Sequence, residues 1–217
     1  MTLAENIQKV QARIAAAAEQ AGRDPSEVTL VAATKVQTSE TIRAAIAAGI
    51  TVCGENRAQE FTQHWQDGAY EGAKVHFIGH LQKNKLKYLV GKVDLIESVD
   101  SEELIRLIDK RAQNLGIVQD ILIEVNIGGE ASKSGVKPEE VEALVALAAS
   151  LPGVEPRGLM AIPPVAQEPG ANRAVFAAMR QLFIDIKGKT YNNKVNIDCL
   201  SMGMSGDFED AIAEGAT

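Results

Sequence analysis

The chain is poor in aromatic residues and in cysteine. Phe, Trp and Tyr together make up 4% of its 217 residues, and Cys53 and Cys199 are its two cysteines. A low aromatic content beside many alanines is typical of closely packed helices and disfavours a β-sandwich. The cysteines lie far apart, with no metal-ligand spacing around them. We therefore expect two buried free thiols, a reducing compartment and no metal site.

Long apolar runs and an excess of basic residues are also missing. No stretch approaches the roughly 18 consecutive apolar residues that a membrane-spanning helix needs. The N-terminal segment 1–5 is an acid-bearing helix start and not a signal peptide, so we expect a cytoplasmic protein with no membrane contact. The net charge of −7 argues against nucleic-acid binding. A small anion held by local backbone donors remains compatible with this charge.

The chain does contain a regular alternation of strand and helix patterns. Leu3, Ile7 and Ile14 stand at helical spacing, and Thr2 with Glu5 predicts a capping box for this first helix. Seven strands are then expected, each followed by a helical pattern: 28–34, 50–54, 75–78, 93–99, 120–127, 154–162 and 195–200. Such alternation is typical of α/β proteins with a parallel sheet.

Seven strand–helix units after one extra N-terminal helix predict a TIM-like (β/α)8 barrel whose eighth strand is missing from the given chain. An open sheet with helices on both faces is the alternative. The segment after the first strand lacks the glycines of a dinucleotide-binding fingerprint. No linker or low-complexity tract divides the chain, so we expect residues 1–217 to form a single domain.

Lys35 stands at the end of the first apolar run, Val28–Thr34. A lysine ammonium at the end of a buried strand has to be solvated, paired or chemically used. Barrel enzymes bind their ligands at the carboxyl ends of the strands. We therefore expect a partly buried amine at the barrel mouth, although a lysine that simply extends into solvent has the same sequence signature.

A second signal is the loop after the last strand, which carries Ser201, Gly203 and Ser205. Serines and glycines before a helix offer hydroxyls and backbone N–H groups to a phosphate. An amine beside a phosphate site suits a phosphorylated aldehyde, of which pyridoxal phosphate (PLP) is the commonest cofactor. An alternative that needs no cofactor is a Schiff base between Lys35 and a sugar phosphate. Asn56 and Met160 also stand at strand ends. Considered alone, Asn56 is more simply interpreted as a turn former and Met160 as a core residue.

Six motifs, in order along nearly the whole chain, resemble the PLP homeostasis proteins of the YggS/PROSC type. These motifs are Thr34-Lys35, GEN at 54–56, HFIGHLQKNK at 76–85, SKSG at 132–135, GLMAIP at 158–163 and LSMGMS at 200–205. The family is similar in fold to the N-terminal barrel of alanine racemase. The resemblance implies PLP as cofactor, carried and buffered through a reversible aldimine on Lys35, and no catalytic turnover.

The resemblance also implies the remaining contacts and partners. The cofactor-binding residues that it implies are Lys35, Asn56, Met160, Ser201, Gly203 and Ser205, with Lys133 as a secondary contact. PLP-dependent apo-enzymes are the implied recipients, and a monomer is the implied state.

Two departures qualify this resemblance. A racemase takes a tyrosine base from a second domain, whereas Tyr70, Tyr88 and Tyr191 all fall in predicted helices or loops. A single-domain PLP-dependent racemase or lyase therefore stands as the alternative function. Family members also continue past Thr217 with an eighth strand and a glycine–threonine phosphate loop, and we expect both to be missing from the given chain.

Overall fold

The computed structural model describes residues 1–129, 134–166, 168–189 and 196–217. Within these ranges, seven strands form one sheet in the order β1-β2-β3-β4-β5-β6-β7, and all six neighbouring pairs are parallel. The strands are β1 (Val31–Ala33), β2 (Val52–Glu55), β3 (Lys74–Phe77), β4 (Leu95–Val99), β5 (Gln119–Glu124), β6 (Val154–Met160) and β7 (Cys199–Ser201). The predicted alternation of strand and helix is confirmed.

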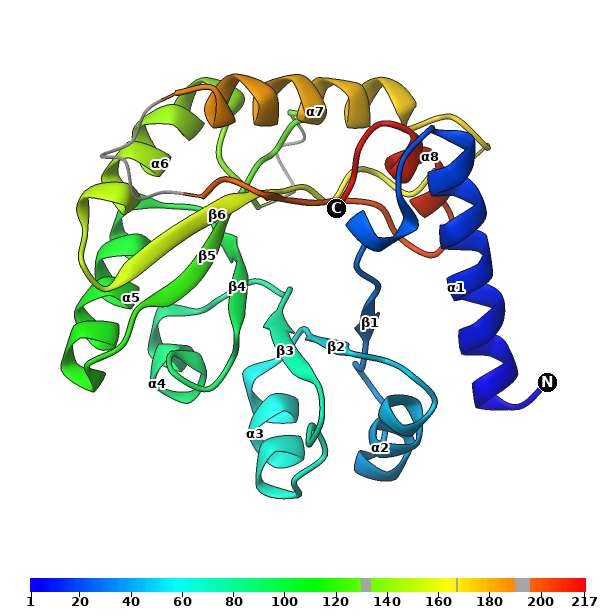
Figure 1. Cartoon of the computed structure of the whole chain (residues 1–217). Coiled ribbons are helices and arrows are strands. Elements are labelled where there is room, and N and C mark those ends of the chain that lie inside the picture. The colour runs from blue at the N-terminus through cyan, green and yellow to red at the C-terminus, as the bar shows by residue number, and fades with distance from the viewer. Residues whose placement is uncertain (130–133, 167, 190–195) are drawn as a thin grey trace.

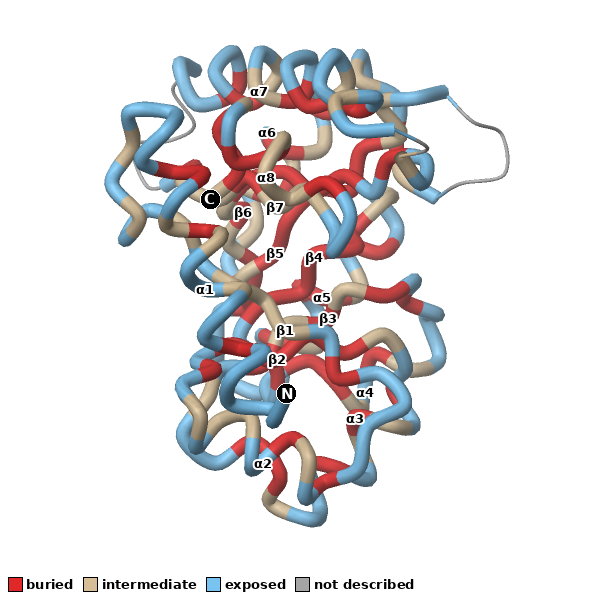
Figure 2. The backbone as a smooth tube through the Cα atoms, turned by 90° about the vertical axis from the view of Figure 1, so that its right-hand side faces the viewer, coloured by how far each residue is buried: buried red, intermediate tan, exposed pale blue. Residues whose placement is uncertain are grey.

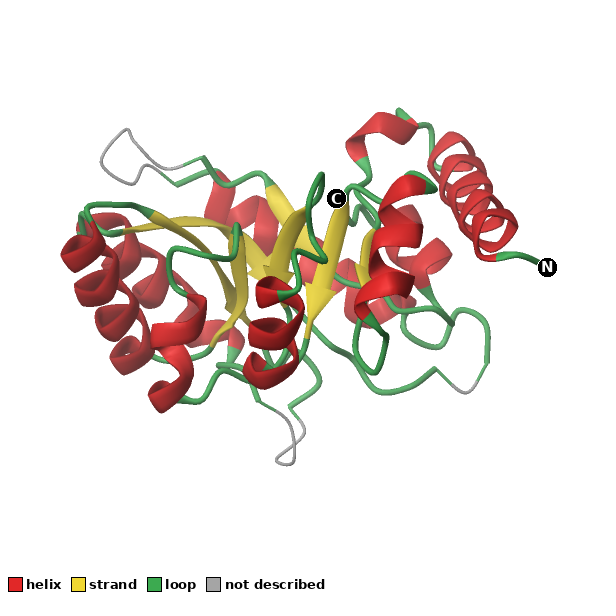
Figure 3. Ribbon diagram, turned by 90° about the horizontal axis from the view of Figure 1, so that it is seen from below, coloured by secondary structure: helices red, strands yellow, loops and turns green. Residues whose placement is uncertain are grey.

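The helices lie outside the curled sheet, which stays open between β7 and β1 (Figures 1 and 3). The α-helices are α1 (Leu3–Gln20), α2 (Ser39–Ala47), α3 (Ala58–Gln66), α4 (Leu86–Leu89), α5 (Glu102–Leu115), α6 (Val141–Ser150), α7 (Arg173–Lys187) and α8 (Phe208–Ala213). Short 3-10 turns are η1 (Pro25–Glu27), η2 (Lys83–Lys85) and η3 (Pro138–Glu140). This is a half-barrel of the TIM type, as predicted, with α8 packed beside α1.

Local sequence signals set several helix boundaries. Thr2 and Glu5 form the predicted capping box of α1, in which each side chain bonds to the other residue's backbone N–H. Ser101 is the N-cap of α5, and Gly116 ends that helix in a left-handed conformation. The strand boundaries were predicted less well. The first strand was expected over 28–34 but spans only Val31–Ala33. It is an edge strand that pairs with β2 alone, and the length of this pairing limits its extent.

The hydrophobic core lies between the outer face of the sheet and the helices, where the buried segments concentrate (Figure 2). Ile96, Ile121 and Ile123 are fully buried there. The inner face of the half-barrel carries a smaller apolar cluster of Leu95, Leu122 and Met160, with Cys199 packed against them. A parallel sheet covered on one face and curled around the other explains why its central strands are apolar on both sides.

Thr217 lies in the gap between the two edge strands. Its backbone N–H donates to Leu200 of β7 (3.0 Å), and its carbonyl accepts from Thr29, two residues before β1 (2.7 Å). Its hydroxyl accepts a further bond from the N–H of Leu200 (2.8 Å). These contacts put one residue in the place that an eighth strand occupies in a closed barrel.

The structure also tests the expected thiols. Cys53 is buried, and burial raises the pKa of its thiol to about 11. Cys199 is partly buried, and burial likewise raises the pKa of its thiol to about 12. Among the described residues, both thiols are free, and no three His, Cys, Asp or Glu side chains gather as a metal site. None of the helices in the described ranges is long and apolar enough to cross a membrane.

Candidate functional site

The predicted site residues follow the carboxyl ends of four strands. Lys35 lies in the turn after β1, Asn56 directly follows β2, Met160 ends β6 and Ser201 ends β7. The carboxyl ends of parallel strands meet at one edge of the sheet, so these residues share one rim of the half-barrel. Met160 and Ser201 are direct register partners. Lys133 lies outside the described residues.

Lys35 and the loop after β7 lie on opposite sides of the gap that Thr217 occupies. Neighbouring strands lie about 4.8 Å apart, so two such spacings separate the edge strands by roughly 10 Å. A lysine side chain together with a small phosphorylated aldehyde can bridge this span. Lys35 is exposed, contrary to the partial burial that we expected, because it lies in a turn beyond the end of β1.

Ser201 offers its hydroxyl to the interior of the half-barrel. The hydroxyl donates to Glu97 Oε2 on β4 (2.5 Å), and Glu97 Oε1 lies 2.7 Å from His76 Nδ1 on β3. This chain of polar groups crosses the inner face of the sheet. A carboxylate beside Ser201 repels a phosphate, so the anion would lie further along the loop, at Gly203 and Ser205.

The rest of that loop is shaped by packing against α8. Gly203 has φ +92°, and a Cβ built there would lie 2.7 Å from the Ala211 side chain, so only glycine fits. The Met204 N–H donates to Asp207 Oδ1 (2.6 Å), and Asp207 is itself held by the Asn172 amide (2.7 Å). Ser205 is exposed. The loop thus has a fixed base and a solvent-facing rim that an anion can reach.

Met160 is 3% exposed and belongs to the apolar cluster on the inner face. Both of its predicted roles, as core residue and as a side chain at the mouth, are compatible with this position. The apolar cluster forms the floor beneath the rim, and a planar ring could pack on it.

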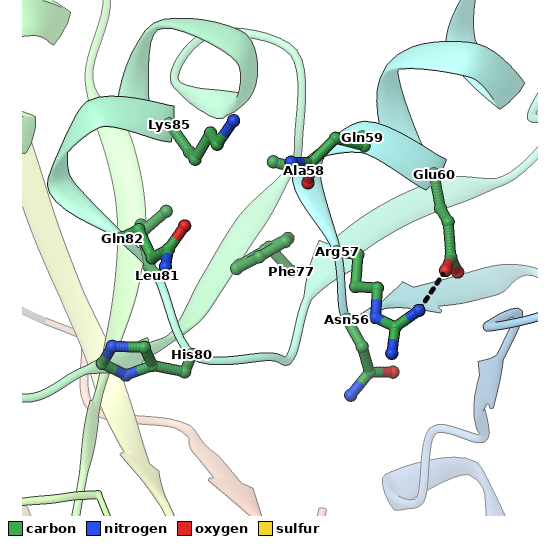
Figure 4. Close-up of a pocket in the computed structure, with 10 residues that line it drawn as sticks. All are labelled: Asn56, Arg57, Ala58, Gln59, Glu60, Phe77, His80, Leu81, Gln82 and Lys85. Carbon is green, nitrogen blue, oxygen red and sulfur yellow. Dashed lines mark hydrogen bonds and ion pairs between the residues drawn. The ribbon is translucent and has the colours of Figure 1, made fainter.

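Asn56 borders a hollow of about 510 Å³ at the ends of β2 and β3. Figure 4 shows its lining, with the Arg57–Glu60 ion pair on one side and Lys85 on the other. The Asn56 Oδ1 atom is buried and has no hydrogen-bond partner among the described residues. The loop is fixed from behind by Gly79, since a Cβ there would lie 2.1 Å from the Asn56 carbonyl oxygen. Asn56 is therefore a rigidly held polar group with unused hydrogen-bonding capacity.

Glu124, at the end of β5, faces the same rim as its register partner Met160. Its Oε1 accepts the Ser134 hydroxyl (2.6 Å), while its Oε2 is buried without a hydrogen-bond partner among the described residues. Burial raises the pKa of the Glu124 carboxyl above its ordinary value of 4.5; the nearby Asp100 adds to this, and the Ser134 bond opposes it. A carboxyl of this kind binds a proton more tightly in the folded state than in the unfolded one.

The raised pKa of Glu124 predicts that the unfolding free energy depends on pH. Glu124 stabilises the fold fully below the unfolded pKa near 4.5, and that contribution is lost as the pH rises through the higher folded pKa. Each pKa unit corresponds to about 1.4 kcal/mol. The Glu124→Gln variant keeps an acceptor for Ser134 and does not ionise. We expect the unfolding free energy of the variant, measured by urea titration, to rise relative to that of the parent chain as the pH increases from 4 to 8. A difference that is constant over this range would contradict the assignment.

Glu55, the last residue of β2, lies on the outer face of the sheet. Its carboxylate is fully buried and accepts from the hydroxyls of Thr34 and Tyr70. His64, on α3, completes this cluster and was not identified from the sequence. Its partners Tyr70, Glu55 and Gln37 lie 6, 9 and 27 residues away, so no local pattern marks them. The one available signal was Glu55 itself, an acid at the end of a buried strand.

Comparison with known proteins places these features in a family. The family model described as "Alanine racemase, N-terminal domain" matches residues 3–216. The PLP homeostasis protein of Aquifex aeolicus is 45% identical over 217 residues, covering 100% of this chain and 94% of that protein. Its name describes homeostasis and not an enzymatic reaction.

Two solved structures have the same fold over almost their full length. An unknown protein from Bifidobacterium adolescentis gives a TM-score of 0.90 at 39% identity, covering 99% of this chain and 90% of that one. PipY of Synechococcus elongatus with PLP bound gives 0.85 at 30% identity, covering 100% and 95%. With the motif set and the half-barrel already described, these matches show that the chain belongs to the alanine racemase N-terminal domain family, among the pyridoxal phosphate homeostasis proteins.

Proposed function

We propose that this chain binds PLP at the rim of the half-barrel and carries and buffers the cofactor, and so contributes to PLP homeostasis in the cell. The observation that carries the proposal is the full-length match to a homologous structure that contains PLP. The residues present also fit the ligand. Lys35 follows β1, a loop with Gly203 and Ser205 follows β7, and an apolar floor lies between the two.

In this proposal, Lys35 is the point of attachment. Bound PLP supplies an aldehyde, which an amine captures reversibly. The Lys35 Nζ forms a carbon–nitrogen double bond with the aldehyde carbon and the aldehyde oxygen leaves as water; hydrolysis returns both groups. Gly203 and Ser205 hold the phosphate, while Asn56, Met160 and Ser201 contact the rest of the molecule. Lys133 is the proposed secondary contact.

The proposed role does not include turnover of amino acids. Racemisation needs a second base at the mouth. The Tyr70 hydroxyl is buried and donates to Glu55 (2.6 Å), and burial raises the pKa of this phenol strongly. Tyr88 lies on α4, in the helix layer, and not at the end of a strand. Tyr191 lies outside the described residues. In this proposal neither Tyr70 nor Tyr88 serves as the second base. We propose one domain, 1–217, that acts as a monomer and supplies PLP-dependent apo-enzymes.

Borohydride reduction of the purified protein with PLP, followed by peptide mass spectrometry, tests the proposal. We expect the reduced pyridoxyl group on Lys35. A group found only on other lysines, or on none, would contradict the attachment site. Exchange of the α-hydrogen of amino acids in deuterated water provides the second test. Exchange well above the rate with free PLP would favour the racemase or lyase alternative.

A further inference from the structure

A buried polar cluster lies directly behind the turn that carries Lys35. Its centre is Glu55 Oε1, which accepts the hydroxyls of Thr34 (2.5 Å) and Tyr70 (2.6 Å) and lies 3.1 Å from His64 Nδ1. Glu55 is 0% exposed and His64 is 7% exposed. The cluster faces the helix layer and is separated from the rim by the strand ends. It is therefore distinct from the groups proposed to touch PLP.

This cluster holds the Lys35 turn at both ends. Thr34 precedes Lys35 and donates to Glu55 from the end of β1. On the other side, His64 Nε2 lies 3.1 Å from the carbonyl oxygen of Gln37. The Gln37 N–H closes the turn by donating to the Thr34 carbonyl (3.1 Å). One buried group thus fixes the backbone before Lys35, and its partner fixes the backbone after it.

The turn needs such support because its backbone is strained. Val36 has φ +64° and is 84% exposed. A β-branched residue rarely adopts this left-handed conformation, which costs on the order of 1–3 kcal/mol. Packing of an exposed Val36 side chain cannot supply the compensation. The contacts that can hold it are hydrogen bonds: the Val36 N–H donates to Glu60 Oε2 (3.3 Å), and the bonds from Thr34 and to Gln37 lie on either side.

One ring nitrogen of His64 has a defined role. The Gln37 carbonyl only accepts, so His64 Nε2 carries a hydrogen. His64 Nδ1 lies within hydrogen-bonding distance of both Glu55 Oε1 (3.1 Å) and the Tyr70 hydroxyl (3.2 Å). A glutamine at position 55 has the same shape but carries no negative charge, so the hydroxyls of Thr34 and Tyr70 would donate to a weaker acceptor.

We propose that Glu55 and His64 are positioning residues for Lys35. By holding Thr34 and Gln37, they keep the strained turn in one conformation and present the amine at a fixed point on the rim. Preorganisation of this kind raises the rate at which a bound aldehyde meets the amine. The inference rests on the proposed function in one respect, namely that Lys35 is the amine that reacts.

The test compares Glu55→Gln with the parent chain by two readouts. Without PLP, amide hydrogen exchange of residues 34–37 reports the turn itself. With PLP, timed borohydride quenching and mass spectrometry report the rate of attachment to Lys35. We expect Glu55→Gln to exchange the Gln37 amide at least 10-fold faster and to attach PLP roughly 10- to 100-fold more slowly, as for loss of a buried charged hydrogen bond.

Two controls separate positioning from general destabilisation. Asp109→Asn also alters a buried carboxylate, which accepts from the Gly153 N–H (2.8 Å) far from Lys35, and it should change neither readout. If Glu55→Gln fails to fold, Thr34→Val and Thr34→Ser replace it. The valine lacks the hydroxyl and should reproduce the defect, whereas the serine should retain near-parental attachment.

The outcomes are distinguishable. If the parent chain attaches PLP at Lys35 and Glu55→Gln does so at an equal rate, the positioning role is wrong and the proposed function stands. If Asp109→Asn slows attachment as much as Glu55→Gln does, the effect is one of stability and the positioning role is again wrong. If the parent chain shows no attachment at Lys35, the proposed function fails, and this inference fails with it.

Discussion

Replacement of Lys35 by alanine is expected to abolish covalent attachment of PLP at the rim and to remove the visible absorption band of the loaded protein. The imine needs an amine held within reach of the aldehyde. The other lysines are not held next to the bound aldehyde, so they would react with it no faster than a free amine in solution does. Loss of that proximity should weaken apparent retention of PLP by roughly 100-fold or more. Equilibrium dialysis with absorbance scanning measures both effects.

Lys110→Ala is the matched control for this experiment. Lys110 is an exposed lysine on α5, within the helix layer, so its removal changes the charge equally and leaves the rim intact. We expect it to bind as the parent chain does. An unchanged band in Lys35→Ala, or an equal loss in both variants, would remove Lys35 from its proposed role and with it the basis of the carrier mechanism.

Substitution of Gly158 by alanine should have the largest effect on stability. Gly158 lies in β6 opposite Cys199 of β7, with φ +154°, and a Cβ built there would lie 1.8 Å from the Cys199 carbonyl oxygen. The clash is with backbone in a paired strand and cannot be relieved by a rotamer change. We expect a loss of about 3–5 kcal/mol, from overpacking together with backbone strain. Urea unfolding followed by circular dichroism measures it.

Gly116→Ala is the matched comparison, because Gly116 also has a positive φ (+69°) but no atom within 4 Å of the added Cβ. Its substitution should cost only about 1 kcal/mol, from the left-handed backbone alone. Equal losses in the two variants would mean that β7 moves away freely. The close approach of β6 and β7 would then contribute little to holding the loop that carries Ser201 and Gly203.

The order and type of the elements could be predicted from the sequence because they depend on local patterns. Apolar spacing marked the helices, and Thr2 with Glu5 marked the first helix start, which the structure confirms. The ends of the strands were less accurate, since hydrogen bonds to a neighbouring strand decide where a strand ends. Ile127 and Ile162, for example, were expected within strands and lie beyond their ends.

The sequence alone predicts the half-barrel fold, through strict alternation of strand and helix, and the family, through six motifs in order. It also placed Lys35, Asn56, Met160 and the 201–205 loop at strand ends, because chain direction alone fixes which end of a parallel strand they follow.

Tertiary structure sets which way side chains turn and which distant groups meet. It turned Glu55 outward to Thr34 and His64, and it set Ser201 against Glu97 across the sheet, 104 residues apart in sequence. The direction of a side chain at a strand end follows from strand register, and register depends on pairing and on the curl of the whole sheet. No local pattern in the chain carries that information.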